Sequence, residues 1–392
     1  MRRFRPVARQ VASNRTPRHI NSNVVMNLIR RTQPVSRADL ARLSTLRPST
    51  VSLIIEDLIV SDWVLEGEAA NSTRGRKPLL LSLNPKRAVI ALDIHPSQTT
   101  VAVTDISGRI VVQEAVGLAD KPARALDTMI RAIRRLLEAH SDRSFAGIGV
   151  CLPGRTDASA GKLIFAPNLG WPIVSLKAKI ERATGLRVEM DNVANACALS
   201  EVWFGDSDGG QGLVVVEVSE GIGTGIFLNG SIVRGCQGMA GEFGHIQMVE
   251  DGLLCNCGGR GCWETVASNR AAVRRYRQVS GAGRPVTFST LLRLERNGDE
   301  AACAALRHVA ECLGRGMRMI VAALDPAEII VVGEITAAWQ TVGPIVDACM
   351  RQGSLGVKTR LRPSYDGASA RLRSAVALVL GERLPAGFER TA

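Results

Sequence analysis

The hydrophobic pattern at the start of the chain consists of two helical repeats. Apolar residues recur at helical spacing over residues 23–31 and again over residues 49–59, after Pro48. Between these repeats, Ser36 is followed by Asp39 three positions later, an arrangement that resembles a capping box and predicts a short helix. Two helices joined by a tight turn, the second beginning with small polar residues, are typical of a helix-turn-helix.

Strand-like runs replace the helical repeats after residue 61. Two runs with the composition of strands occupy residues 63–68 and 78–83. The segment between them holds three cations and a glycine. This pattern predicts a β-hairpin wing and hence a winged helix-turn-helix over residues 19–84, although a helical packing unit without a nucleic-acid partner stays an alternative. The recognition helix and the wing are predicted to contact DNA through Arg47, Ser49, Thr50, Ser52, Arg74, Arg76 and Lys77.

The remainder, residues 85–392, shows one order of elements twice. Three strand-like runs, a helix over residues 123–140 and a fourth strand come first, and the same order begins again after residue 210. Two similar halves in tandem predict a two-lobed α/β domain, with the boundary between lobes near residues 205–212 and a C-terminal helix returning to the first lobe. A ligand is then expected in the cleft between the lobes.

Positive charge is concentrated at the N-terminal end of the chain. Of the net charge of +12, residues 1–84 contribute 14 Lys+Arg against 6 Asp+Glu. Such a bias favours a polyanionic partner, although six of these arginines lie in residues 1–18, which have no apolar periodicity and are predicted to form a disordered basic arm. No apolar run is long enough for a membrane span and no secretory signal is present, so we expect a cytoplasmic protein without a membrane partner.

A compact group of metal-binding side chains lies in residues 238–264. His245 is followed by Cys255, Cys257 and Cys262 in a glycine-rich segment. One imidazole and three thiolates form a closed tetrahedral zinc set with no position for a catalytic water, so the predicted zinc is structural. The alternative, buried cysteines without a metal, fits scattered residues better than this block. The odd total of nine cysteines disfavours a disulfide framework.

The blocks GMAGEFGH and CNCGGRGCWE, with CLPG and NLGW upstream, resemble the ROK family of repressors, open reading frames and kinases. The resemblance covers nearly the whole chain, including the N-terminal winged helix of the repressor branch. It implies the two-lobed, ribonuclease H-like fold of actin and sugar kinases, and it assigns zinc to His245, Cys255, Cys257 and Cys262. It also implies sugar contacts from Asn168, Asn192, Glu242, His245 and Glu264. An alternative is that Glu242 and Glu264 only brace the zinc loop.

Three departures from the kinases of that family concern phosphoryl transfer. The segment from Asp93 to Thr99 holds His and Pro where the kinases have a glycine-rich turn that approaches phosphate. Val193 stands at the position of the catalytic Asp, and valine cannot accept a proton. Glu334 follows Gly333 where the kinases have a glycine pair near the adenosine. We therefore predict a degenerate kinase domain and no enzyme activity.

The resemblance and the departures together predict a sugar-responsive repressor of genes for carbohydrate uptake or catabolism. Its partners would be operator DNA and a sugar or sugar phosphate, and its assembly a homodimer or homotetramer. Two alternatives remain. The GIGTG turn at residues 221–225 keeps open an active sugar kinase fused to a DNA-binding domain, and a regulator controlled by a protein partner is the other.

Overall fold

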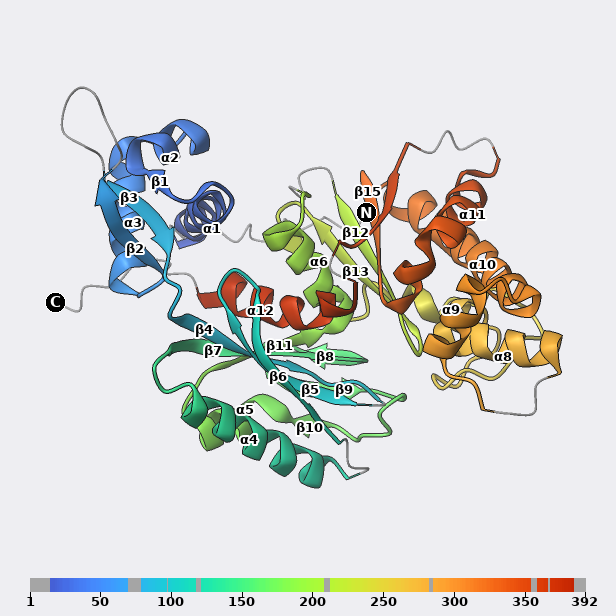
Figure 1. The fold of residues 1–392 in the computed structure, drawn as a ribbon. Helices are drawn as coiled ribbons and strands as arrows, with labels where there is room; N and C mark the ends of the chain where they lie inside the picture. Colours follow the sequence, from blue (N-terminus) through green and yellow to red (C-terminus); the bar gives the residue numbers. More distant parts are fainter. Residues whose placement is uncertain are drawn as a thin grey trace, which may run out of the picture. The chain divides into compact units, whose positions relative to one another are not determined.

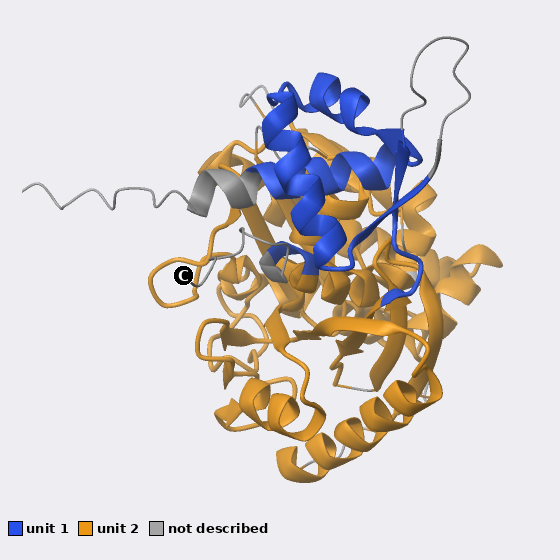
Figure 2. Cartoon of the chain, turned by 90° about the vertical axis from the view of Figure 1, so that its left-hand side faces the viewer, with its two compact units in different colours: residues 1–87, 380–392 blue, residues 88–379 orange. Residues whose placement is uncertain are grey.

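The chain divides into two compact units (Figure 2). Residues 1–87 with 380–392 form unit 1, and residues 88–379 form unit 2. The computed structural model describes residues 15–69, 79–96, 98–117, 121–207, 212–281, 285–353, 358–365 and 367–383. The predicted wing contacts Arg74, Arg76 and Lys77 lie outside the described residues, and so does the predicted arm up to residue 14.

Unit 1 has the order of elements of a winged helix-turn-helix. Its helices pack on a small sheet in which β3 lies between β1 and β2. The apolar side of α3, formed by Val51, Ile54, Ile55 and Leu58, is buried as its spacing predicts. The bounds are α1 (Arg15–Thr32), β1 (Val35–Ser36), α2 (Arg37–Ser44), α3 (Pro48–Val60), β2 (Val64–Ala69) and β3 (Leu79–Leu83).

The sequence pattern predicted the N-terminal end of α2 correctly and that of α1 incorrectly. The hydroxyl of Ser36 accepts a hydrogen bond from the amide of Asp39 at 3.2 Å, which confirms the predicted cap of α2. Helix α1, however, begins at Arg15, eight residues before the predicted start at 23 and inside the predicted arm 1–18. Its first half lacks an apolar stripe, so periodicity gave no signal there, although a helix anchored by its apolar half can extend through polar residues.

The first sheet of unit 2 has the order β11-β7-β4-β5-β6. The strands β4, β5 and β6 are antiparallel neighbours, whereas β7 and β11 run parallel. A smaller sheet, β10-β9-β8, leaves this lobe after β7. The bounds are β4 (Arg87–Asp93), β5 (Thr99–Asp105), β6 (Ile110–Val116), α4 (Pro122–Ala139), β7 (Ser144–Leu152), β8 (Arg155–Asp157), β9 (Lys162–Phe165), β10 (Val174–Ser175), α5 (Leu176–Thr184), β11 (Val188–Asn192) and α6 (Val193–Phe204).

The second sheet repeats this topology in the order β16-β15-β12-β13-β14, which confirms the predicted tandem halves. Between its third and fourth strands the chain inserts the segment with the cysteines and a group of helices. The bounds are β12 (Leu213–Val218), β13 (Ile222–Leu228), β14 (Ser231–Ile232), η1 (Glu242–His245), α7 (Trp263–Ala267), α8 (Asn269–Ser280), α9 (Phe288–Arg296), α10 (Glu300–Leu324), β15 (Glu328–Val332), η2 (Glu334–Ala338), α11 (Trp339–Arg351), β16 (Arg360–Pro363), η3 (Gly367–Ser369) and α12 (Ala370–Arg383).

Helices α6 and α12 lie between the two sheets of unit 2 (Figure 1). Their buried side chains share one apolar cluster with residues of both sheets, while α4 and α5 cover the outer face of the first sheet. Two strand glycines allow this close packing. A Cβ at Gly149 would lie 1.8 Å from the carbonyl oxygen of Ala375 in α12, and one at Gly225 would lie 2.1 Å from that of Ala194 in α6. Each central helix is therefore held tightly against one sheet.

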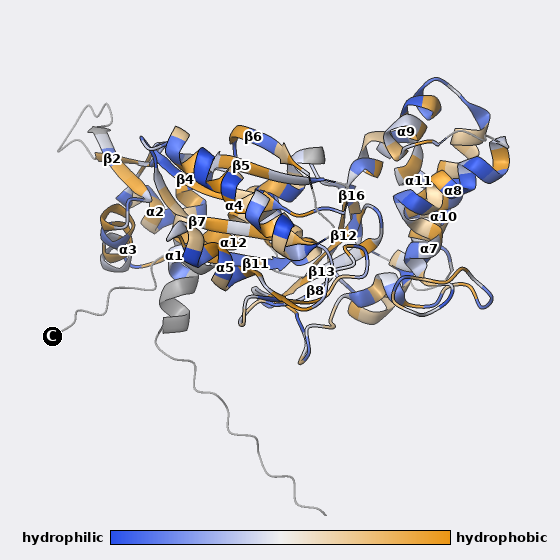
Figure 3. Cartoon of the chain, turned by 90° about the horizontal axis from the view of Figure 1, so that it is seen from below, coloured by the Kyte–Doolittle hydropathy of each residue, from blue (hydrophilic) through white to orange (hydrophobic). Residues whose placement is uncertain are grey.

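Hydropathy follows this layering (Figure 3). The strands β5 and β7 carry long hydrophobic stretches, whereas hydrophobic and hydrophilic residues alternate along α4. In α4, Leu126, Met129 and Ile133 are buried against the first sheet. Across the part of the chain that the structure describes, no helix combines the length and the apolar character that a membrane crossing requires.

Candidate functional site

The four predicted zinc ligands come together in unit 2. The Nδ1 or Nε2 atom of His245 and the sulfurs of Cys255, Cys257 and Cys262 all lie within 4.8 Å of one another. The Cys257 and Cys262 sulfurs are 3.7 Å apart, and the Cys255 sulfur is 3.5 Å from His245 Nδ1. Tetrahedral zinc bonds of about 2.3 Å to sulfur and about 2.0 Å to nitrogen require edges of about 3.8 Å and about 3.5 Å. The donor set thus fits a zinc ion, with Nδ1 as the imidazole ligand.

The loop that holds these ligands is anchored by glycines and by Trp263. A Cβ at Gly261, where φ is +65°, would lie 1.7 Å from the carbonyl oxygen of Val249. The indole of Trp263 is fully buried against Gly316 of α10 and donates its N–H to the carbonyl of Cys312 at 2.9 Å. Because Trp263 follows Cys262 directly, the position of the four predicted zinc ligands is fixed to α10, the main helix of the second lobe.

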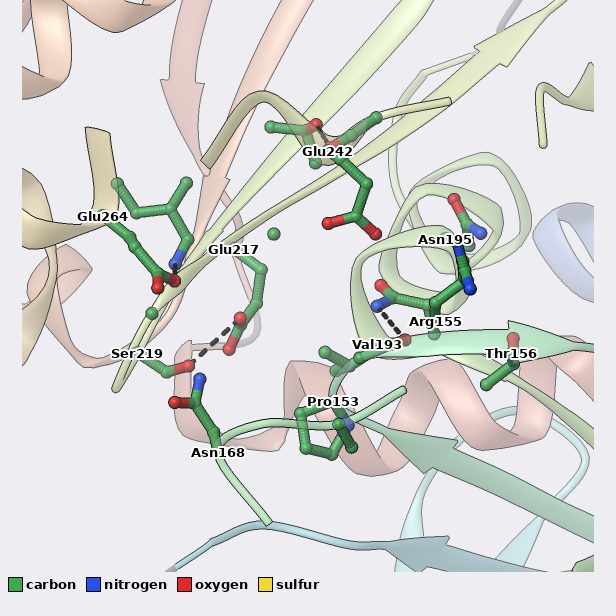
Figure 4. Close-up of a pocket in the computed structure, with 18 of the residues that line it drawn as sticks. Pro153, Arg155, Thr156, Asn168, Val193, Asn195, Glu217, Ser219, Glu242 and Glu264 are labelled. Carbon is green, nitrogen blue, oxygen red and sulfur yellow. Dashed lines mark hydrogen bonds between the residues drawn. The ribbon is translucent and has the colours of Figure 1, made fainter. Parts of the chain in front are cut away.

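A pocket extends from this cluster between the two lobes of unit 2 (Figure 4). It is lined by all five predicted sugar contacts: Asn168, Asn192, Glu242, His245 and Glu264. Figure 4 shows Glu242, Asn168 and Val193 around one open space, with Glu264, Ser219 and Asn168 along one side of it. The pocket therefore contains carboxylate acceptors and an amide, the groups that recognise vicinal hydroxyls.

The two carboxylates lie on opposite sides of the His245 ring. Glu264 Oε1 is 3.7 Å from Nδ1, and Glu242 Oε2 is 3.6 Å from Nε2. If Nδ1 binds a metal, Nε2 must carry the proton and faces the pocket as a donor. Gly221 makes room for Glu264, because a Cβ at that position would lie 2.4 Å from Glu264 Oε2.

The two predicted asparagine contacts differ in how far their amides are already used. Asn192 caps α6, since its Oδ1 accepts from the Ala194 amide at 2.8 Å and its Nδ2 donates to the Gly154 carbonyl at 2.8 Å. Asn168 accepts one bond, from Asn256 of the zinc loop at 2.7 Å. This bond joins the first lobe to the zinc loop, and it leaves the Asn168 Nδ2 beside Gly221 and Glu264.

At the other end of the pocket, Arg371 joins two carboxylates. Its Nε is 2.9 Å from Asp93 Oδ2, its Nη2 is 2.8 Å from Asp93 Oδ1, and its Nη1 is 2.6 Å from Glu217 Oε1. The side chains of Asp93, Glu217 and Arg371, called the Arg371 triad below, are 4–13% exposed. Burial alone would lower the pKa of Arg371, but the two carboxylates hold it well above its ordinary value. Burial and Arg371 lower the pKa of the neighbouring His95 to about 4.

Asp191, the carboxylate nearest in sequence to Val193, is also fully engaged. Its Oδ2 accepts two hydrogen bonds from Arg234, at 3.0 and 2.7 Å. Its Oδ1 accepts from the Asn192 amide at 2.7 Å and from Asn195 Nδ2 at 3.1 Å. Both oxygens of Asp191 are therefore already occupied by hydrogen bonds from the protein.

The third predicted departure, Glu334, begins η2 and is separated from β15 by Gly333. The carboxylate accepts a hydrogen bond from Asn269 Nδ2 at 3.2 Å. Burial raises the pKa of Glu334, and the nearby Glu220 raises it further. The structure thus places acidic groups at the end of β15.

In unit 1, the residues predicted to contact DNA from the recognition helix differ in exposure. Arg47 and Ser49 are exposed, while Thr50 and Ser52 are half-buried. Leu53, which is 56% exposed, and Glu56 share the exposed side, and the sequence interpretation missed both. The helical spacing of residues 49, 53 and 56, opposite the buried apolar stripe, was the signal that would have found them.

The Arg371 triad was missed as well, because its members are widely separated along the chain. Asp93 ends β4, Glu217 lies near the end of β12 and Arg371 is in the first turn of α12. No local motif links three residues of this kind. The equivalent places of β4 and β12 in the two sheets were a signal that acidic residues at both strand ends would meet.

Comparison with known proteins identifies the family. Residues 89–381 match the ROK family. The chain belongs to the ROK family. It is 29% identical to a xylose repressor of Bacillus subtilis over 91% of this chain and 92% of that protein. It is 28% identical to the DNA-binding transcriptional dual regulator NagC of Escherichia coli over 86% of both chains.

Two solved ROK structures differ in how much of the chain they cover. A ROK transcriptional regulator, a homologue of the E. coli MLC protein, superposes with a TM-score of 0.78 at 26% identity, over 94% of this chain and 98% of its own. A ROK glucokinase from Streptomyces griseus, in complex with glucose and AMPPNP, gives 0.67 at 28% identity, over 74% and 98%. The ROK regulator therefore accounts for nearly all of this chain, whereas the kinase leaves a quarter of it uncovered.

Proposed function

We propose that this protein is a sugar-responsive transcriptional repressor of genes for carbohydrate uptake or catabolism. Unit 1 would bind operator DNA, and the pocket of unit 2 would bind a sugar or sugar phosphate. The xylose repressor, NagC and the ROK regulator each match this chain over most of its length and over most of their own length. The observation that carries the proposal is the pocket itself, which Asn168, Glu242 and Glu264 line at one end, while Arg371 occupies the other end between Asp93 and Glu217.

The same pocket supports the inference that the protein is not a kinase. Val193 cannot accept a proton, and Asp191 is held by Arg234. Loss of a general base typically costs about a hundredfold to ten-thousandfold in rate. In addition, the Arg371 triad places a buried guanidinium and two carboxylates where the glycine-rich turns of a kinase approach phosphate. Each of these features acts against a separate part of phosphoryl transfer.

Zinc is proposed as a structural cofactor held by His245, Cys255, Cys257 and Cys262. The observed sulfur–sulfur and sulfur–nitrogen separations support it. A bound zinc would fix the loop that carries Glu242 and Glu264 and would set the tautomer of His245. Glu242, His245 and Glu264 remain proposed sugar contacts together with Asn168. Asn192 also remains a proposed contact, through the second lone pair of Oδ1 and the second N–H of Nδ2 that its two hydrogen bonds do not use.

Release of DNA would follow from a sugar-dependent change in the arrangement of the two lobes. We propose a homodimer or homotetramer that binds a pseudo-palindromic operator. A sugar that binds one arrangement better by about 3 kcal/mol changes operator affinity by about 150-fold. Such a difference in sugar affinity between the two arrangements is within the usual range of allosteric coupling, and it requires no covalent chemistry.

A thermal-shift panel tests the sugar proposal against the kinase alternative, which the 28% identity to a glucokinase keeps in view. The panel contains D-xylose, D-glucose, N-acetyl-D-glucosamine and their phosphorylated forms, each with and without Mg·ATP. We expect one compound to raise the melting temperature without ATP. A rise that requires ATP, accompanied by ADP formation, would move the kinase to first place. No rise with any compound would count against a sugar effector.

A further inference from the structure

The Arg371 triad connects the two lobes of unit 2 through one side chain. Asp93 ends the central strand of the first sheet, and Glu217 lies on the corresponding strand of the second sheet. Arg371 belongs to α12, which packs on the first sheet at Gly149. The hydrogen bonds to Asp93 therefore lie within the first lobe, whereas the bond to Glu217 crosses from the first lobe to the second.

The sugar contacts are divided between the same two lobes. Asn168 belongs to the first lobe, while Glu242, His245 and Glu264 belong to the second. A sugar that bonds to both groups requires a particular separation of the lobes. Hydrogen-bond donors and acceptors lose most of their interaction when displaced by about 1 Å, so a small change in this separation weakens binding.

We propose that Arg371 is a positioning residue that sets the separation of the lobes at which the sugar contacts meet, a role that rests on the proposed sugar-binding function. Its guanidinium draws the strand end at Glu217 toward the strand end at Asp93. Without this cation, the two buried carboxylates repel each other and the lobes move apart. Ser219, which donates to Glu217 Oε2 at 3.1 Å, holds that carboxylate toward the arginine.

A purely structural ion pair is the competing explanation, and a set of variants separates the two. Glu217→Gln removes the charge on the far side of the crossing bond while the hydrogen bonds from Arg371 to Asp93 remain. Arg371→Met combined with Glu217→Gln removes both groups and leaves the same local charge as in the wild type. Arg371→Lys keeps the cation but loses the forked geometry. The matched control is Arg373→Met, on the same helix, whose guanidinium lies 4.8 Å from the Phe204 ring and outside the pocket.

The experiment measures sugar affinity by calorimetry and thermal stability by melting for each full-length variant. The probe is whichever of the three sugars or their phosphorylated forms binds the wild type. We expect Glu217→Gln to weaken sugar binding about tenfold with a small change in melting temperature. Arg371→Met should lower both affinity and melting temperature. The double variant should regain stability but not affinity, and Arg371→Lys should lie between the wild type and Arg371→Met.

The results separate the two proposals. If the wild type binds a sugar and both Glu217→Gln and the double variant bind it with unchanged affinity, the positioning role is wrong and the sugar function stands. Recovery of affinity together with stability in the double variant also overturns it, because the triad is then only structural. If the wild type binds none of the probes, the proposed sugar function fails, and the positioning role fails with it.

Discussion

The two ends of the pocket differ in how their polar groups are used. At the end next to the cysteine cluster, Glu242 and Glu264 line the pocket without a guanidinium bound to either in the described residues. Glu264 accepts hydrogen bonds from the Cys255 thiol at 2.9 Å and from the Ile222 amide at 3.4 Å, and the Asn168 amide nitrogen lies beside it. At the other end, Asp93 and Glu217 are bound to Arg371, and Asp191 is bound to Arg234. Polar groups that already bind one another have little left for a ligand. Under the proposed function, the end next to the cysteine cluster would recognise the ligand, while the end at Arg371 and Arg234 would belong to the scaffold.

The largest effect is expected at the cysteine cluster, which supports the open end of the pocket. Cys262→Ser should abolish zinc binding, lower the melting temperature by more than about 10 °C and remove the sugar response, because structural zinc contributes directly to folding. Zinc content and melting curves measure this. Cys236→Ser, which changes an exposed cysteine outside the cluster, is the control. A zinc-free Cys262→Ser protein with wild-type stability would contradict the structural role.

The next effect concerns the open carboxylates. Glu242→Gln should weaken sugar binding by about 10- to 100-fold, because a hydrogen bond to a charged acceptor contributes about 1.5–3 kcal/mol. Calorimetric titration measures the change, with Glu250→Gln, an exposed residue of the zinc loop, as the control. Unchanged affinity would favour the alternative that Glu242 only braces the loop.

A smaller effect is expected from Gly221→Ala. The added Cβ would lie 2.4 Å from Glu264 Oε2, so the carboxylate must move and sugar affinity should fall about three- to tenfold. Gly117→Ala, where a Cβ would meet no atom within 4 Å, is the matched control. If both variants bind sugar equally well, Glu264 does not contact the ligand.

The smallest effect tests the DNA side. Arg47→Ala should weaken DNA binding similarly across sequences and make the dependence of log K on log salt shallower by about one unit, as expected for one lost phosphate contact. The comparison protein is Arg124→Ala, an exposed arginine of α4 in unit 2. A change in sequence preference with an unchanged salt slope would assign Arg47 to bases.

The sequence predicted those features that depend on local spacing. The capping box at Ser36, the buried stripe of α3 and the repeated strand order all follow from periodicity and turn chemistry. The cysteine cluster was predicted because its three thiols lie within eight residues. The start of α1 at Arg15 was missed, since a polar helical segment extended from an apolar one leaves no periodic trace.

Contacts between residues far apart in the sequence could not be predicted from it. Arg371 and Asp93 are 278 positions apart, and only the folded sheet order brings them together. Likewise, the sequence could not show that Asp191 is bound to Arg234, or that Asn192 caps α6 with its Oδ1 while its Nδ2 donates to the Gly154 carbonyl. These contacts distinguish an occupied end of the pocket from an open one, and they are the basis of the functional proposal.

The most direct test of this account is operator binding measured with and without sugar. DNA that binds the full-length protein would be selected from a random pool, and its affinity measured by fluorescence anisotropy at fixed salt. We predict that saturating amounts of the sugar from the thermal panel weaken DNA binding by about 5- to 150-fold, and that Mg·ATP has no such effect. Unchanged DNA affinity in the presence of a sugar that demonstrably binds the pocket would contradict the coupling between the two units.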